Sequence, residues 1–196
     1  MKKLFQAALV ALMLVPSWGL AQDFDKGLAA YQAGDYAVAL QELRPLAKQG
    51  DAAAQYNLGR MYANGYGISQ DDAEAVDWYR KAAEQGYADA QYNLGGMYSN
   101  GKGVLQDDAE AVTWWRKAAE QGDAYAQTNL GFMYRDGEGV LQDAVLAHMW
   151  FNIAGANGIG GSDLRGEVEQ RMTREQIAEA QARARRCMAS DYQDCD

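Results

Sequence analysis

The sequence contains few of the residues that build metal sites. Among its 196 residues there are one histidine and two cysteines, whereas transition metals take several such ligands at short spacings. The histidine, His148, stands where neighbouring segments carry valine, which favours a packed imidazole over a catalytic base. We therefore predict no metal site, no cofactor and no catalytic residue.

The two cysteines, Cys187 and Cys195, both lie close to the end of the chain. In an exported protein, an even pair so close in sequence favours a disulfide. Such a bond closes a short loop and would contribute about 2 kcal/mol in the chain-entropy model.

Long hydrophobic runs are also missing. The only extended apolar stretch, Leu4–Val15, follows two lysines and precedes Gly19-Leu20-Ala21, and it is shorter than the roughly 20 residues that a membrane-spanning anchor needs. This pattern is typical of a secretory signal peptide over residues 1–21. We predict a mature chain from Gln22 that is periplasmic and not stably inserted in a membrane.

Basic residues are outnumbered by acidic ones, 18 to 27, which gives a net charge of −9. Signal removal would make the charge −11, because Lys2 and Lys3 are lost. Such a surface repels phosphate backbones, so we predict no nucleic-acid partner, and it attracts basic segments of proteins.

What the chain does have is a repeat. Asp51-Ala-Ala-Ala-Gln-Tyr-Asn-Leu-Gly59 returns in similar form at Tyr87 and again at Asp123, a step of 36 residues. A fixed period of this size is typical of stacked repeats, each burying its apolar face against its neighbours.

Each repeat contains two helical patterns separated by a glycine-rich turn. In the first pattern Ala54, Leu58 and Met61 share one helical face, and glycines stop that helix. Asp71 and Asp107 then have a glutamate three residues on, which predicts acidic N-caps. A short connection predicts antiparallel neighbours.

Glycine also recurs inside the first helix of each repeat, at Gly59, Gly95 and Gly131. Glycine costs about 1 kcal/mol relative to alanine in a helix. We therefore expect a close contact to the helix backbone here, one that a side chain would block.

The pattern resembles the Sel1-like repeat family, a branch of the tetratricopeptide superfamily. The residues that carry the resemblance in the second unit are Ala90, Leu94, Gly95, Tyr98, Gly101, Gly103, Val104, Asp107, Ala111, Trp114, Trp115, Ala118, Ala119 and Gly122. The resemblance implies an all-α, right-handed solenoid of antiparallel helix pairs that serves as a scaffold for protein or peptide binding.

The predicted organisation follows the repeat. After the signal peptide (1–21) we expect a degenerate tetratricopeptide-like helix pair (22–50), which caps the stack or binds a partner of its own. Repeats 1, 2 and 3 then occupy 51–86, 87–122 and 123–158, and a C-terminal cap with the disulfide occupies 159–196.

The second helix of repeat 3 is unusually apolar. Leu146, Met149, Ile153 and Ala156 replace polar residues of repeat 2. We expect a helix over 174–188, which begins with the capping box Thr173-x-x-Gln176, to cover this face after a loop at 159–162. The alternative is that a separate protein docks there.

The predicted binding surface lies on the concave side, where tetratricopeptide relatives present the first helix of each unit. By register its residues are Tyr56, Asn57, Arg60, Asn64, Tyr92, Asn93, Asn100, Asn129, Phe132 and Arg135. In peptide-clamping relatives an asparagine at the recurring position holds the main chain of the ligand. The same asparagines could instead bond the neighbouring repeat, because a buried amide needs a partner either way.

The sequence thus favours an exported, non-catalytic scaffold that binds a protein or peptide partner in envelope assembly or regulation. One alternative is an enzyme acting on cell-wall material or β-lactams, for which Ser99-x-x-Lys102 is a weak match without its usual partner motif. Another is a groove that binds glycan strands, which the aromatic content allows.

Overall fold

The computed structural model describes residues 17–195, which form ten α-helices and, within that range, no strand. The helices are Ser17–Gln32 (α1), Tyr36–Lys48 (α2), Ala52–Asn64 (α3), Asp72–Glu84 (α4), Ala88–Asn100 (α5), Asp108–Ala119 (α6), Ala124–Asp136 (α7), Ala144–Ala156 (α8), Gly161–Glu169 (α9) and Arg174–Ala189 (α10).

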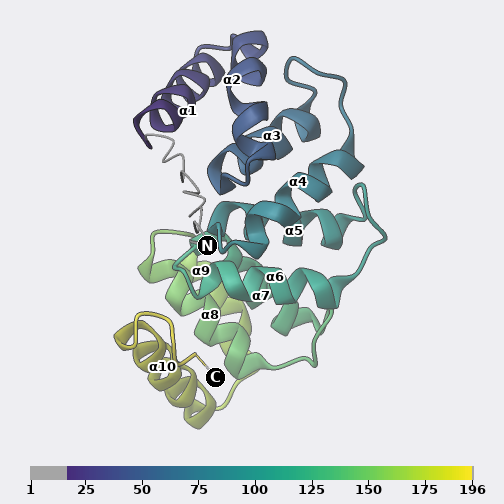
Figure 1. Cartoon of the computed structure of the whole chain (residues 1–196). Coiled ribbons are helices and arrows are strands. Elements are labelled where there is room, and N and C mark those ends of the chain that lie inside the picture. Colours follow the sequence, from purple (N-terminus) through teal and green to yellow (C-terminus); the bar gives the residue numbers. More distant parts are fainter. Residues whose placement is uncertain (1–16, 196) are drawn as a thin grey trace, which may run out of the picture.

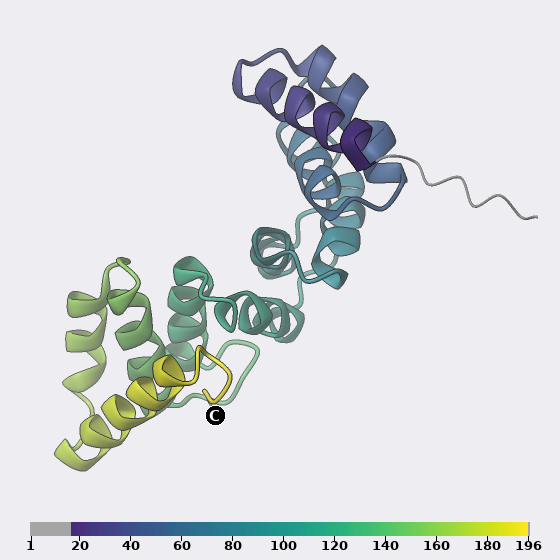
Figure 2. The ribbon, with the colours of Figure 1, turned by 60° about the vertical axis from the view of Figure 1, so that its left-hand side comes forward.

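The first eight helices form four antiparallel pairs that stack in chain order (Figure 1). Each second helix also packs against the first helix of the next pair. Figure 2 shows that the stack bends along its length, with α1 and α2 at one end and α10 at the other. The predicted all-α solenoid of antiparallel helix pairs is confirmed.

Aspartates cap every helix of the repeats except α5, which follows Tyr87, and glycines end the first helix of each repeat. The aspartates that cap the second helices through backbone N–H groups are Asp71, Asp107 and Asp143. The glycines that follow the first helices in the left-handed conformation are Gly65, Gly101 and Gly137. These caps satisfy helix-end groups that would otherwise lack partners, so the helix bounds follow directly from the sequence.

The internal glycines of the first helices lie against aromatic rings of the second helices. The pairs are Gly59 with Tyr79, Gly95 with Trp115, and Gly131 with Phe151. A Cβ added at Gly95 would lie 2.7 Å from the Trp115 ring, closer than van der Waals contact allows. The expected close approach to the helix backbone is observed, and the approaching group is a ring.

Buried glutamines join successive helix pairs. The side-chain amide of Gln91, 4% exposed, donates to the carbonyl of Ala83 in α4 at 3.1 Å, and its oxygen accepts from Gln121 at 2.7 Å. The equivalent glutamines Gln55 and Gln127 make the same two kinds of contact. Each glutamine therefore connects its own repeat to the end of the preceding pair.

The C-terminal segment covers the apolar face of α8, as predicted. Met149 and Ile153 are fully buried, and Val168 of α9 with Ala184 of α10 belongs to the same core cluster. The capping box of Thr173 and Gln176 is present at the start of α10.

One expectation for this segment is wrong: the residues from 161 onward do not form a connecting loop but begin α9, Gly161–Glu169. Two glycines give this stretch a low helix propensity. Leu164 and Val168, four residues apart, pack against the core of repeat 3, and this tertiary contact stabilises the short helix.

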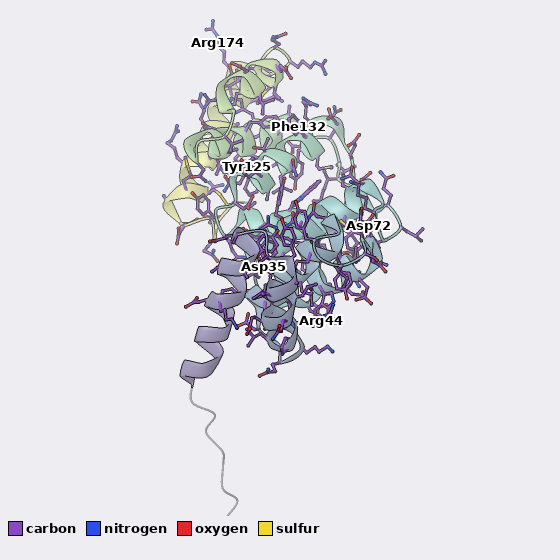
Figure 3. The ribbon with its side chains drawn as sticks, turned by 90° about the horizontal axis from the view of Figure 1, so that it is seen from above. Asp35, Arg44, Asp72, Tyr125, Phe132 and Arg174 are labelled. Atoms are coloured by element: carbon purple, nitrogen blue, oxygen red, sulfur yellow. A yellow bond between two sulfur atoms is a disulfide. The ribbon has the colours of Figure 1, made fainter. Side chains whose placement is uncertain are left out.

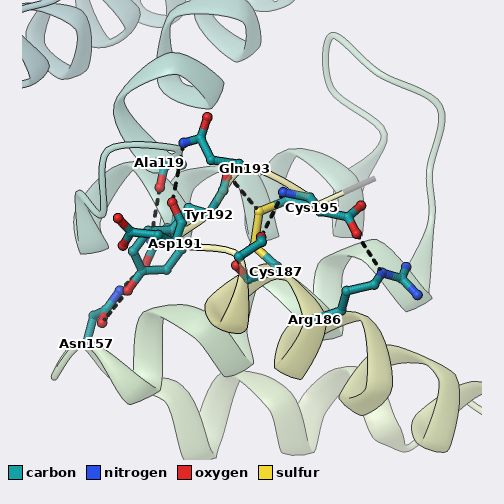
Figure 4. Close-up of a disulfide and its surroundings, with 11 residues drawn as sticks. Ala119, Asn157, Arg186, Cys187, Asp191, Tyr192, Gln193 and Cys195 are labelled. Atoms are coloured by element: carbon teal, nitrogen blue, oxygen red, sulfur yellow. Dashed lines mark hydrogen bonds and ion pairs between the residues drawn. A yellow bond between two sulfur atoms is a disulfide. The ribbon is translucent and has the colours of Figure 1, made fainter.

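A disulfide joins Cys187 of α10 to Cys195, with the two Cα atoms 4.4 Å apart. In the turn between them, the Tyr192 hydroxyl donates to Asn157 at the end of α8 at 3.0 Å (Figure 4). The disulfide therefore closes this turn, and the hydrogen bond of Tyr192 attaches the turn to repeat 3.

The predicted signal peptide lies mostly outside the described residues. Helix α1 begins at Ser17, before the predicted mature start at Gln22, and packs against α2. Among the described residues, no helix combines the length and hydrophobicity needed to cross a membrane.

Candidate binding groove

The first helices of the three repeats, α3, α5 and α7, belong to successive pairs of the stack, and the surface they form around one shared cavity is here called the first-helix groove. A cavity of about 570 Å³ opens in it. Residues from all three repeats line this cavity, among them Asp72 of α4 and Phe132 of α7 (Figure 3). The sequence period therefore places side chains that are 36 residues apart around one space.

Six of the predicted binding residues line the cavity. They are Asn64, Tyr92, Asn93, Asn100, Asn129 and Phe132. The other four, which do not line it, are Tyr56, Asn57, Arg60 and Arg135.

The recurring asparagines have partners within the chain. Asn57 is 5% exposed, and its amide nitrogen donates to the Ala53 carbonyl of its own helix at 2.8 Å. Asn93 lies near Tyr56, and Asn129 near Tyr92, in each case a tyrosine of the preceding repeat, and each amide acts to lower the pKa of that tyrosine. Asn93 and Asn129 therefore lie beside the preceding repeat and also line the cavity.

The tyrosines of the groove are neutral at physiological pH. Burial raises the pKa of Tyr92, and the nearby Asp123 carboxylate raises it further, although the Asn129 amide acts in the opposite direction. Burial likewise raises the pKa of Tyr56, which does not line the cavity. The Tyr92 ring therefore presents an uncharged phenol group to the cavity.

Asn64 and Asn100 stand at the exposed edge of the cavity. Each amide nitrogen donates to the backbone carbonyl four residues earlier, at 2.8 Å for Asn64 and 2.7 Å for Asn100. Each hydrogen bond uses one of the two N–H groups of the amide, so the other N–H group and the accepting amide oxygen remain for a ligand.

The two predicted arginines are occupied by contacts within the chain. The guanidinium of Arg60 lies 5.1 Å from the ring centroid of Tyr31 and 5.7 Å from that of Tyr56. Arg135 pairs with Asp136 at 2.7 Å and with Glu167 of α9 at 3.4 Å. The hydrogen bond from Arg135 lowers the pKa of Asp136.

Arg135 also lines a second cavity, of about 610 Å³, between the end of α7 and α9. Asp136, Glu167 and Arg171 line it as well. Its two basic and two acidic groups balance one another, so the cavity has no net charge that would select a ligand.

Several residues of the first cavity were missed by the sequence reasoning. Tyr79 and Trp115 reach it from the second helices, and Asp72 and Lys102 stand beside the turns. Each internal glycine of a first helix implies a bulky partner on the second helix. This signal could have identified Tyr79 and Trp115, the partners of Gly59 and Gly95. Gly96 also lines the cavity. The sequence pattern does not identify it as a binding residue, because glycine carries no functional group.

The weak match to a serine enzyme also falls at this cavity, since Ser99 and Lys102 both line it. The one histidine lies elsewhere. His148 of α8 is 1% exposed, and its Nε2 lies 2.7 Å from Glu169 of α9. It is a packed residue between repeat 3 and the C-terminal cap.

Comparison with known proteins identifies the repeat. The model of the Sel1 repeat matches three times in succession, at residues 52–87, 88–123 and 124–159. These matches cover more than half of the chain. No match was found among curated proteins.

Two solved structures are similar to this chain. The Sel1 repeat protein from Oxalobacter formigenes has 29% sequence identity and a TM-score of 0.70, covering 86% of this chain and 77% of its own. The protective antigen c5321 of uropathogenic Escherichia coli strains, which displays an SLR fold, has 29% identity and a TM-score of 0.61. That match covers 88% of this chain, which spans about half (47%) of the antigen.

Proposed function

We propose that this chain, which belongs to the Sel1 repeat family, is an exported, non-catalytic scaffold that binds an extended segment of an envelope protein in the first-helix groove. Sel1 repeats generally form helical scaffolds for protein interaction. The proposal takes the groove as the interaction surface and the bacterial envelope as the compartment.

The observation that carries the proposal is the cavity shared by three repeats. Amides of Asn64, Asn93, Asn100 and Asn129 surround it, and an amide oxygen can accept from the main-chain N–H groups of an extended peptide. Aromatic rings form much of the remaining lining, so the groove offers both main-chain and side-chain contacts.

Export is supported by two features of the chain. Residues 1–21 have the charged start, apolar middle and small-residue end of a signal peptide. The disulfide between Cys187 and Cys195 fits an oxidising compartment such as the periplasm.

Site-specific photo-crosslinking would test the groove. We would place a benzophenone side chain at the exposed cavity residue Asn100, and a matched one at Glu84, an exposed residue at the end of α4 that does not line the cavity. We expect one discrete protein adduct from position 100 in intact cells and none from position 84. Equal labelling from both positions, or none from 100, would contradict the proposal.

A separate experiment would test export. The substitution Leu12→Arg breaks the apolar stretch of the signal, so the protein should remain as an unprocessed precursor in the cytosol. The parent should be recovered from the periplasm with Gln22 at its N-terminus. A parent protein that retains residues 1–21 in the cytosol would overturn the export proposal without affecting the groove.

A further inference from the structure

Position 96 differs from its counterparts in the other two repeats. The same place of the first helix carries Arg60 in repeat 1, Gly96 in repeat 2 and Phe132 in repeat 3. In repeat 1 the arginine side chain lies across Tyr31 and Tyr56. In repeat 3 the Phe132 ring lies 5.2 Å from that of Phe151.

Only in repeat 2 is this place left open by the chain itself. A Cβ built at Gly96 has no neighbouring heavy atom within 4 Å, whereas one at Gly95 would collide with Trp115. Gly96 also has no positive φ that would require glycine. Neither packing nor backbone conformation accounts for the glycine, and its effect is to form a recess in the wall of the 570 Å³ cavity.

Repeat 1 indicates what such a recess can hold. Tyr56 precedes Arg60 by four residues, and the guanidinium lies 5.7 Å from the centre of its ring. Tyr92 precedes Gly96 by the same four residues and lines the cavity. In repeat 2 the tyrosine is kept and the arginine is absent, so the ring can receive a cation from another molecule.

The polar lining around the recess consists mainly of amides, which offer acceptor oxygens as well as donors. The amide oxygens of Asn64 and Asn100 can accept from a ligand, since each side chain is held in place by one hydrogen bond from its nitrogen to the backbone. The half-buried Asp72 adds a carboxylate, and Lys102, at the exposed edge, is the one basic residue in the lining. A guanidinium, with five N–H donors and no acceptor, matches acceptors of this kind.

We propose that the Gly96 recess binds an arginine side chain of the partner segment, stacked on Tyr92 in the way that Arg60 is stacked on Tyr56. The acidic net charge of −9 attracts a basic segment over a longer range. This inference rests on the proposed function, because it assumes that a protein segment occupies the groove.

The test is an NMR titration of the purified, ¹⁵N-labelled protein with two short peptides, acetyl-Gly-Gly-Arg-Gly-Gly-amide and its citrulline counterpart. Citrulline has nearly the same shape without the charge. We expect the arginine peptide to shift the amide signals of Tyr92, Gly96 and Asn100. The citrulline peptide should bind more weakly, by at least about tenfold in the dissociation constant.

Two variants at the recess sharpen the test. Gly96→Arg supplies the side chain from within, as in repeat 1, and should abolish peptide binding while the protein stays folded. Gly96→Ala adds one methyl group in open space, so it should melt at a higher temperature, and it serves as the folding control for a side chain at this position. Equal shifts with both peptides, or arginine-dependent shifts that persist in Gly96→Arg, would overturn the inference.

The two proposals can fail separately. If the photo-crosslink at position 100 forms but the arginine peptide does not bind, the groove remains the binding surface and the arginine recess is wrong. If the arginine peptide binds but no protein adduct forms in cells, the recess holds a guanidinium, but the scaffold proposal is wrong and so is the assignment of that guanidinium to a partner segment.

Discussion

Repeats 2 and 3 are built from the same helix pair, yet their second helices have different surroundings. Thr113 and Lys117 of α6 are exposed, whereas the equivalent Met149 and Ile153 of α8 are fully buried. Helices α9 and α10 cover α8, whereas α6 packs against its neighbours α5 and α7. A repeat inside the stack can keep a polar outer face, while the last repeat is apolar because a cap must adhere to it.

The largest effect is expected from a charge placed in that covered face. Met149→Asp should destabilise the protein by at least about 3 kcal/mol, because it buries an unpaired carboxylate. The matched variant Thr113→Asp should change the free energy of unfolding by no more than about 0.5 kcal/mol. Urea unfolding measures both, and similar losses would mean that α8 is not covered in solution.

Removing the disulfide should weaken the cap and leave the interior repeats intact. Cys187→Ser combined with Cys195→Ser should cost about 2 kcal/mol, because the unfolded chain is no longer restrained. Hydrogen exchange should then rise in α10 and not in α6. A uniform increase across all repeats would show that the cap and the repeats unfold as one unit.

Alanine at each of two neighbouring glycines of repeat 2 should change the free energy of unfolding in opposite directions. Gly95→Ala should destabilise by about 1–2 kcal/mol, because the new methyl group would meet the Trp115 ring. Gly96→Ala should stabilise by about 0.5–1 kcal/mol, because its methyl group meets nothing and alanine favours the helix. Thermal unfolding of both variants tests this, and a destabilised Gly96→Ala would contradict the open recess.

The smallest effect at neutral pH concerns the ring that packs against the internal glycine. Repeat 1 carries Tyr79 there, repeat 2 Trp115 and repeat 3 Phe151. Burial raises the pKa of Tyr79 well above its ordinary value of 10.0. The folded protein therefore holds this proton more tightly than the unfolded chain, and stability should fall as the pH rises above about 10.

Tyr79→Phe should remove this alkaline sensitivity. We expect stability within about 1 kcal/mol of the parent at pH 7 and a variant more stable than the parent at pH 11. The measurement is the urea midpoint of both proteins at the two pH values. An unchanged difference between them at pH 7 and pH 11 would show that Tyr79 does not resist ionisation.

Much of the fold could be predicted because its signals are local. The period of 36 residues, the aspartate caps and the glycines that end the first helices each act within a few residues of where they stand. The third repeat also showed its need for a cover, since an apolar outer face is costly in water. The same register selected ten candidate groove residues, and six of them line the cavity, while their role in binding stays a prediction.

Other features depend on contacts between segments far apart in the chain. Helix α9 forms in a glycine-containing stretch because Leu164 and Val168 find the core of repeat 3. The asparagines carry no local sign that Asn93 would lie near Tyr56 of the preceding repeat. Arg60 was predicted to face a ligand, and its guanidinium is instead stacked on tyrosines of its own chain.

The sequence by itself determined that this protein is a stack of helix pairs with a C-terminal cap, because periodicity and capping act along the chain. The tertiary structure alone decided where the groove is open. Gly96 is a recess only because the residues across from it, on other helices, leave the space empty. Such a space is a property of several helices together, and no local pattern encodes it.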